Sequence, residues 1–207
     1  MRTSGHTGSR TSYSYGTKIV YGFVHVPKTG GATIGLLPGC RGHYPVSEFQ
    51  AHDHAHEFFT MVRDPYDVMC SAYYFVIRKD IDLTIGTSPF DIMNSELVKL
   101  PIEEFLAHTP ANQLYSHYYD TLTPRDFTIV GHTVEYSRTR ELFARMTKRS
   151  LPNATLNVNP DHKAGEAYDF AYSRKDFAKR FDNDYQLYYE GLDRFKRLCS
   201  DHGIIEA

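Results

Sequence analysis

Residues 18–33 read KIVYGFVHVPKTGGAT, and this stretch decides the fold. Residues 18–26 are mainly β-branched, apolar or aromatic, which predicts a buried strand. Pro27 ends that strand, because proline has no backbone N–H to donate to a sheet. A glycine-containing turn follows at residues 28–31, and a short apolar run occupies residues 32–37. The stretch therefore predicts a strand, a glycine turn and a short helix.

The same order recurs further along the chain. Residues 57–62, EFFTMV, indicate a second strand that ends at Arg63-Asp64-Pro65, and apolar spacing predicts a helix over residues 66–78. A third strand is expected at residues 127–130. Further helices are expected at residues 101–108, 111–119, 137–146 and 173–199, and a turn-rich loop at residues 151–165. Strands that alternate with helices predict an α/β fold with a parallel sheet, whose ligands bind at the carboxyl ends of the strands.

The composition fits one domain of ordinary globular type. The chain has 207 residues and a formal net charge of -2, so it has no overall positive field to attract nucleic acid. Its 3 cysteines form no CxxC pair, which favours a reducing compartment. No segment approaches the ~18 apolar residues that span a bilayer. We expect a flexible leader at residues 1–17, a single domain at residues 18–207, and a soluble cytoplasmic protein without a membrane span.

The turn after the first strand has the chemistry of an anion site. It carries a lysine, two hydroxyl groups and two glycines, namely Lys28, Thr29, Gly30, Gly31 and Thr33. Glycines let the backbone approach an oxyanion, and the N-terminus of a helix adds free N–H groups and partial positive charge. The lysine precedes the glycines, so the order GxxxxGK[ST] of nucleoside triphosphatases is missing. The alternative is a glycine turn that only connects a strand to a helix.

A second cation follows the second strand. Arg63 ends the strand, and Ser71 lies two helical turns further along, so a guanidinium and a hydroxyl can converge on one phosphate. Two such sites on two strand ends of one sheet suit a ligand with phosphates at both ends. The alternative for Arg63-Asp64-Pro65 is a turn that starts the helix and contains a local ion pair.

Both segments resemble those of a known family. Residues 23–31, FVHVPKTGG, resemble the 5′-phosphosulfate loop of sulfotransferases that use 3′-phosphoadenosine 5′-phosphosulfate, in particular the heparan and chondroitin O-sulfotransferases. Residues 59–67, FTMVRDPYD, continuing through residues 71–74, resemble the family's 3′-phosphate motif. Weaker similarity continues at residues 112–113, 127–135, 156–159 and 184–188. The resemblance implies a P-loop-like three-layer fold with a central parallel sheet flanked by helices.

The resemblance also implies roles for individual residues. It assigns the 5′-phosphosulfate to Lys28, Thr29, Gly30, Gly31, Ala32 and Thr33. It assigns the 3′-phosphate to Arg63 and Ser71, with Lys163 as a candidate second contact or, alternatively, a solvated loop lysine. A lysine beside the bridging oxygen stabilises the negative charge that develops on the leaving group, so Lys28 is the leading catalytic candidate.

The acceptor hydroxyl also needs a base. His43 stands in a Gly-His segment that resembles the one where some family members place this base, and imidazole titrates in the right range. The alternatives are a histidine of the nearby trio, or the carboxylates Glu48 and Asp53. The trio, His52, His54 and His56, has a spacing that can also bind a metal, although a polar surface loop is the simpler interpretation and no metal is expected. His25, inside the first strand just before the turn, is expected to be a packed or nucleotide-adjacent histidine rather than the base.

We therefore expect an enzyme that transfers a sulfuryl group to a hydroxyl of a glycan, a lipid or a small alcohol. Only residues 32–42 separate Gly31 from His43, which predicts a trimmed fold with an open acceptor cleft. The missing membrane anchor favours a bacterial or viral cytosolic enzyme. Two other functions remain open, a nucleotide-dependent phosphoryl transferase and a non-catalytic module that binds a nucleotide or glycan.

Overall fold

The structure is a computed structural model that describes residues 21–30, 46, 57–79, 96–111, 114–153 and 170–205. The expected leader at residues 1–17 and the expected short helix at residues 32–37 lie outside these ranges. Within them, no helix is both long enough and apolar enough to cross a membrane.

Three parallel strands form the sheet, in the order β1-β2-β3. They are β1 (Tyr21–Val24), β2 (Glu57–Val62) and β3 (Ile129–His132). Val24 lies opposite Thr60, and Val62 lies opposite His132, so the carboxyl ends of all three strands meet at one edge. The expected parallel sheet is thus confirmed, although β3 begins two residues later than its apolar run predicts. Phe127, at the start of that run, is instead buried against the Tyr119 ring, 4.7 Å away between centroids.

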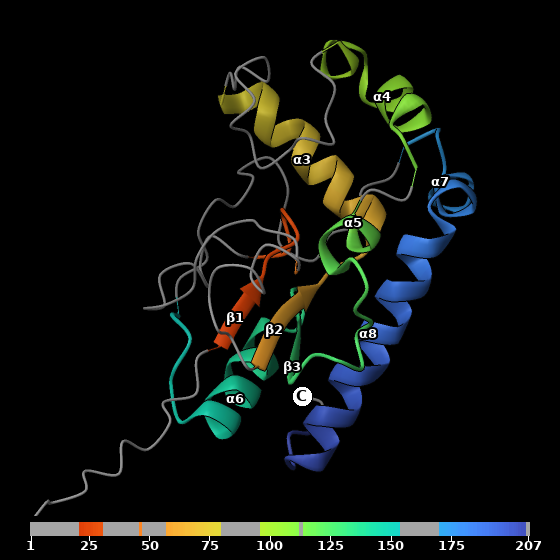
Figure 1. Cartoon of the computed structure of the whole chain (residues 1–207). Coiled ribbons are helices and arrows are strands. Elements are labelled where there is room, and N and C mark those ends of the chain that lie inside the picture. The colour runs from red at the N-terminus through yellow and green to blue at the C-terminus, as the bar shows by residue number, and fades with distance from the viewer. Residues whose placement is uncertain are drawn as a thin grey trace, which may run out of the picture.

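Helices cover both faces of this sheet (Figure 1). Side chains alternate between the faces of a strand, and on β2 Phe59 packs on Phe143 of α6 (Tyr136–Thr147), with ring centroids 5.2 Å apart. The next side chain, Thr60, faces the other way and donates a hydrogen bond of 3.3 Å to the Tyr119 hydroxyl in α5 (Tyr115–Tyr119). The other helical elements are α3 (Pro65–Lys79), η2 (Leu97–Lys99), α4 (Ile102–His108), α7 (Arg174–Arg180) and α8 (Asp182–Asp201).

The helix expected over residues 173–199 is wrong in one respect, because it consists of two helices. Ser173 caps α7 by accepting a hydrogen bond from the Asp176 N–H, and α7 ends at Arg180. Phe181, between the helices, is fully buried and stacks on Phe177 with centroids 4.0 Å apart. The apolar spacing in the sequence continues past Phe181, but this packing interrupts the helix there. The break makes residues 182–185 the first turn of α8.

The close approach of α8 to the sheet depends on a glycine. A Cβ built on Gly191 lies only 2.6 Å from Cγ1 of Val62, a β-branched side chain with little freedom to move. We expect Gly191→Ala to lower the free energy of unfolding by about 1–3 kcal/mol, because the helix must shift from β2. Urea unfolding measures this. Asp193→Ala, an exposed change in the same helix, should stay within about 0.5 kcal/mol of wild type, and equal stability of both variants would contradict the packing.

Candidate anion-binding site

The turn after β1 has an unusual backbone. Lys28 and Gly30 both have positive φ angles, 65° and 99°. Thr29, between them, donates its side-chain hydroxyl to the Val26 carbonyl at 2.7 Å, which closes the turn. Glycine adopts such a conformation without strain, whereas for lysine it costs about 1–2 kcal/mol. Strain of this kind collects at functional sites, where the surrounding structure holds it in place.

Contacts from the other two strand ends hold this turn. The Arg63 guanidinium, just after β2, donates a hydrogen bond of 3.2 Å to the Lys28 carbonyl. Thr133, just after β3, donates its hydroxyl to the Thr29 carbonyl at 2.7 Å, and its N–H bonds the Val62 carbonyl at 3.0 Å. The parallel sheet therefore brings Lys28 and Arg63, which are far apart in sequence, to one edge.

The side chain of Lys28 extends to α3. Its Nζ lies 4.1 Å from the centroid of the Phe75 ring, a cation–π contact worth about 0.5–2 kcal/mol depending on solvation. Ser71 lies one helical turn before Phe75, so both residues share a face of α3. Ser71 itself is half-buried. Lys28, Thr29, Gly30 and Arg63 are thus brought together, and Ser71 lies on the helix face that meets Lys28.

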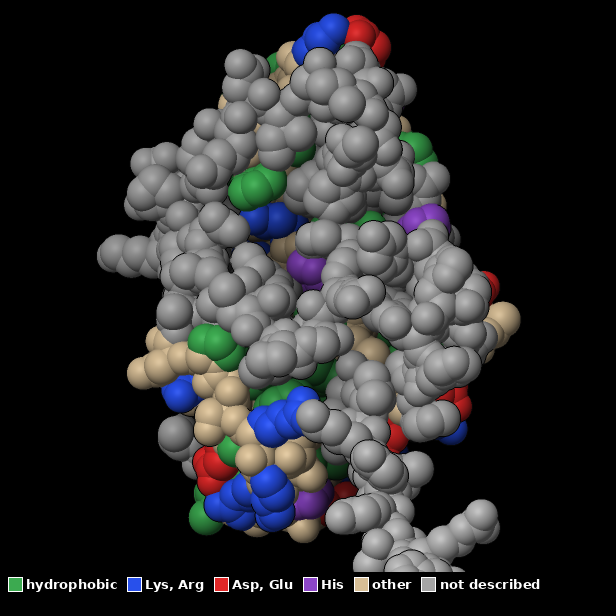
Figure 2. Space-filling view, turned by 60° about the vertical axis from the view of Figure 1, so that its left-hand side comes forward, with side chains coloured by type: hydrophobic (Ala, Val, Ile, Leu, Met, Phe, Trp, Pro, Cys, Tyr) green, Lys and Arg blue, Asp and Glu red, His purple; other side chains and the backbone are tan. Residues whose placement is uncertain are grey.

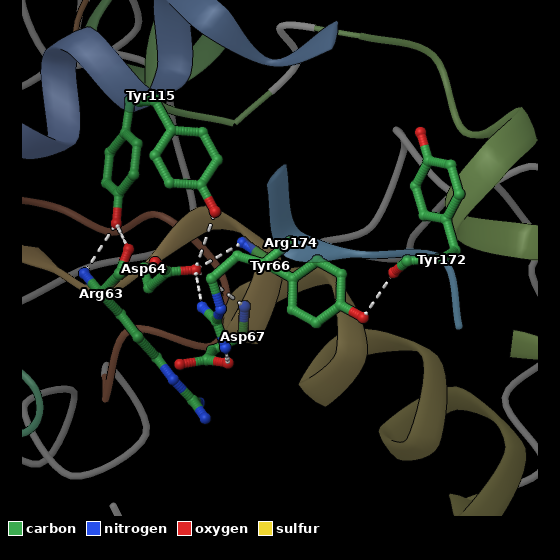
Figure 3. Close-up of polar contacts among 8 residues, drawn as sticks. Arg63, Asp64, Tyr66, Asp67, Tyr115, Tyr172 and Arg174 are labelled. Atoms are coloured by element: carbon green, nitrogen blue, oxygen red, sulfur yellow. Dashed lines mark hydrogen bonds and ion pairs between the residues drawn. The ribbon is translucent and has the colours of Figure 1, made fainter. Parts of the chain in front are cut away.

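The backbone of Arg63 is held by a buried tyrosine. The Tyr115 hydroxyl accepts a hydrogen bond of 2.7 Å from the Arg63 N–H and donates one to the Arg63 carbonyl (Figure 3). Tyr115 is fully buried, and burial raises its pKa well above the usual value, so the hydroxyl keeps the proton that it donates. This pair of bonds fixes the position from which the guanidinium extends.

Asp184 of α8 in turn holds the helix that carries Tyr115. Its carboxylate accepts hydrogen bonds from the Leu114 N–H at 3.1 Å, and from the Ser116 N–H and hydroxyl at 2.9 and 3.0 Å. These bonds satisfy donors that the first turn of a helix leaves unpaired. They also place the start of α5 at Tyr115, later than the expected residue 111.

The acidic residues after Arg63 have a partner other than Arg63. Arg174 pairs with Asp64 at 2.5 Å and with Asp67 at 2.7 Å, and Figure 3 shows these contacts. Asp64 also caps α3 by accepting from the Tyr66 N–H at 2.9 Å. Burial raises the pKa of Asp64, although Arg174 opposes the shift. The segment is therefore a helix-start turn, as the alternative interpretation held, and the ion-pair partner of Asp64 is Arg174.

The end of β3 carries residues for which the sequence motifs give no role. Thr133 ties that end to the glycine turn, and the neighbouring His132 Nδ1 lies 3.1 Å from the Glu135 carboxylate, which also pairs with Arg138. Burial lowers the pKa of His132, although Glu135 opposes the shift. The rule that ligands bind at the carboxyl ends of parallel strands could have identified this segment.

Several expected site residues lie outside the described part of the chain. They are Gly31, Ala32, Thr33, His43, Glu48, His52, Asp53, His54, His56 and Lys163. Their roles remain predictions. His25 is described, is 6% exposed and stacks on the Phe23 ring with centroids 5.2 Å apart, as expected of a packed histidine.

The face in Figure 2 shows basic, hydrophobic and histidine side chains close together near its centre. A cavity of about 360 Å³ lies elsewhere, near the end of α8, with the lining residues Arg138, Lys196, Ser200, Gly203, Ile204 and Ile205. None of its lining residues belongs to the turn after β1 or to the segment after β2, so we place the candidate anion site at Lys28 and Arg63 instead, at the carboxyl ends of parallel strands where ligands bind.

Comparisons of the chain with protein-family models, with curated proteins and with solved structures give no match. The function is therefore inferred from the residues at the strand ends and from the motifs that they form.

Proposed function

We propose that the protein is a sulfotransferase that uses 3′-phosphoadenosine 5′-phosphosulfate as donor and a hydroxyl group as acceptor, on a P-loop-like three-layer fold. The observation that carries this proposal is the hydrogen bond of 3.2 Å from the Arg63 guanidinium to the Lys28 carbonyl. It puts the two cations that the motifs assign to opposite ends of one nucleotide on adjacent strand ends. The acceptor belongs to a glycan, a lipid or a small alcohol.

The residues divide the work of the reaction. The donor supplies a sulfuryl group on a phosphate leaving group, and the acceptor oxygen forms a new S–O bond as the S–O bond to that phosphate breaks. The Lys28 ammonium stabilises the charge on the leaving oxygen. Arg63 and Ser71 bind the 3′-phosphate, and Lys163 is the candidate second cation there. His43 receives the proton of the acceptor hydroxyl.

The donor class is tested by thermal unfolding with three nucleotides. Adenosine 3′,5′-diphosphate should raise the melting temperature more than adenosine 5′-phosphate or ATP at equal concentration, because the stabilisation by a bound ligand grows with the logarithm of its concentration divided by its dissociation constant. Radiolabelled donor and a panel of hydroxyl acceptors then measure transfer directly. Stabilisation by ATP alone would favour a phosphoryl transferase, and binding of the diphosphate without any transfer would favour a binding module.

Arg63 provides a sharper version of this test. We expect Arg63→Ala to weaken binding of adenosine 3′,5′-diphosphate about 10–100-fold, because a charged hydrogen bond to the 3′-phosphate is worth about 1.5–3 kcal/mol. Binding of adenosine 5′-phosphate should change much less. Titration calorimetry measures both constants, and Arg125→Ala, an exposed arginine before β3, is the control. An equal loss of affinity for both nucleotides would contradict the assignment of the 3′-phosphate to Arg63.

A further inference from the structure

We propose that Phe75 is a positioning residue, whose ring holds the Lys28 ammonium on the face of α3 that carries Ser71. No motif in the sequence assigned a role to Phe75. The contact is direct, with 4.1 Å between Nζ and the ring centroid. The inference rests on the proposed function only for the identity of the anion that Lys28 meets.

The two ends of this contact are fixed by different parts of the fold. The Lys28 backbone is held in its positive-φ conformation by the bonds that Arg63 and Thr133 make to the turn. The ring is half-buried and packs against the core from α3, whose first turn Asp64 caps. Between these anchors the lysine has a flexible stem, so its backbone alone does not fix the position of the ammonium. The contact with the ring helps to fix that position.

An aromatic face suits this purpose better than a carboxylate. The π-system attracts a cation through its quadrupole but carries no net charge. The contact with Phe75 therefore orients the ammonium without neutralising it. The Arg63 guanidinium, bonded to the Lys28 carbonyl, adds a second positive charge beside the same turn. The pair keeps a strong field for an anion, and the ring directs one of its two charges toward the Ser71 side of α3.

The position of Ser71 relates the contact between Lys28 and Phe75 to the candidate anion site. Ser71 and Phe75 stand four residues apart in α3, which places their side chains on the same helix face. Without a ligand, the ammonium held on Phe75 thus lies on the Ser71 side of the site, and the 5′-phosphosulfate that Lys28 meets in the proposed function lies beyond this resting position. On nucleotide binding, the ammonium should move from the ring toward the anion, because a full negative charge attracts it more strongly than an aromatic face.

The experiment observes the ammonium directly and does not need enzymatic activity. Lysines are dimethylated with ¹³C-formaldehyde and a borane reductant, which keeps their charge, and the Lys28 methyl resonance is identified by its loss in Lys28→Arg. In the wild-type chain it should be shifted upfield by the ring current of Phe75. Phe75→Leu should return it to the position of exposed lysines, whereas Phe75→Tyr, which keeps an aromatic face, should leave it shifted. Phe58→Leu, the same change in a half-buried ring at the other end of β2, is the control.

Binding and transfer supply the second readout. Phe75→Leu should lower kcat/KM for the sulfuryl donor about tenfold, Phe75→Tyr should restore it, and Phe58→Leu should leave it unchanged. An unshifted Lys28 resonance in the wild type, or one unmoved by Phe75→Leu, would overturn the proposal, as would an equal loss of kcat/KM in Phe75→Leu and Phe58→Leu. If the wild type transfers no sulfuryl group, the proposed function fails, while the Lys28 resonance still decides the role of Phe75.

Discussion

Replacing Lys28 with alanine is expected to lower the rate of sulfuryl transfer about 10²–10³-fold, the usual effect of removing one group that stabilises a developing oxyanion. The effect should fall mainly on kcat, because the charge that Lys28 meets grows as the S–O bond breaks. The structure supports this role through the position of the residue. Lys28 sits in a strained turn at the end of β1, beside Arg63 and against α3.

The measurement needs variants that separate charge from shape. Lys28→Met keeps a long stem that can pack on Phe75 but has no charge, and Lys28→Gly removes the backbone strain together with the side chain. Both should lose as much rate as Lys28→Ala if the ammonium is responsible. Lys99→Ala is the control. Lys99 lies in η2, its side chain is 66% exposed, and it pairs with Glu96, so this variant should transfer the sulfuryl group at the wild-type rate. A wild-type kcat for Lys28→Met at saturating donor would contradict the catalytic role of the Lys28 ammonium.

The sequence predicts those parts of the site whose signals are local. Pro27 and the adjacent glycines indicate the turn after β1, and Arg63-Asp64-Pro65 indicates the end of β2 and the start of α3. These segments carry their own stop and turn residues, so their positions do not depend on the rest of the chain. The parallel pairing of β1 and β2 then brings Lys28 and Arg63 to the same edge.

The supports of the site could not be predicted in this way. Tyr115 bonds the Arg63 backbone across 52 positions of sequence, and Asp184 reaches Leu114 across 70. Arg174 pairs with Asp67 across 107 positions. Such contacts have no periodicity or spacing that a single sequence can show. Even the start of α8, which places Asp184, depends on the burial of Phe181 rather than on a helix-breaking residue.

Because of these contacts, we expect replacement of Asp184 to lower the stability of the fold more than any other change discussed. Asp184 is 0% exposed, and Asp184→Ala removes the acceptor of the buried Leu114 N–H and of the partly buried Ser116 N–H. Each unsatisfied group costs about 1–3 kcal/mol, so we expect a loss of about 3 kcal/mol and a fall in melting temperature of about 10 °C. Asp193→Ala, an exposed change in the same helix, should cost almost nothing.

The raised pKa of Asp184 also predicts the direction in which stability changes with pH. Burial raises the pKa of Asp184 above its ordinary value of 3.8, although hydrogen bonds from Ser116 and Leu114 oppose the shift. The folded chain therefore binds this proton more tightly than the unfolded chain, and the contribution of Asp184 to stability falls as pH rises from about 3.8 through the raised pKa. Asp184→Asn removes that contribution, so its stability should decline less than that of the wild type over this range. Urea unfolding at a series of pH values measures both slopes, and parallel slopes would mean that Asp184 does not titrate differently in the folded chain.

Asp184→Asn, together with Tyr115→Phe, tests whether α5 positions Arg63. Tyr115→Phe removes the two bonds to the Arg63 backbone but leaves the bonds between Asp184 and α5 intact. If α8 acts on the site through α5 and Tyr115, Tyr115→Phe and Asp184→Asn should both weaken binding of adenosine 3′,5′-diphosphate, and the double variant should bind no more weakly than the worse single variant. Additive losses would mean that the two residues act independently. Because Arg63 holds the 3′-phosphate in this proposal, binding of adenosine 5′-phosphate should stay nearly constant across the series.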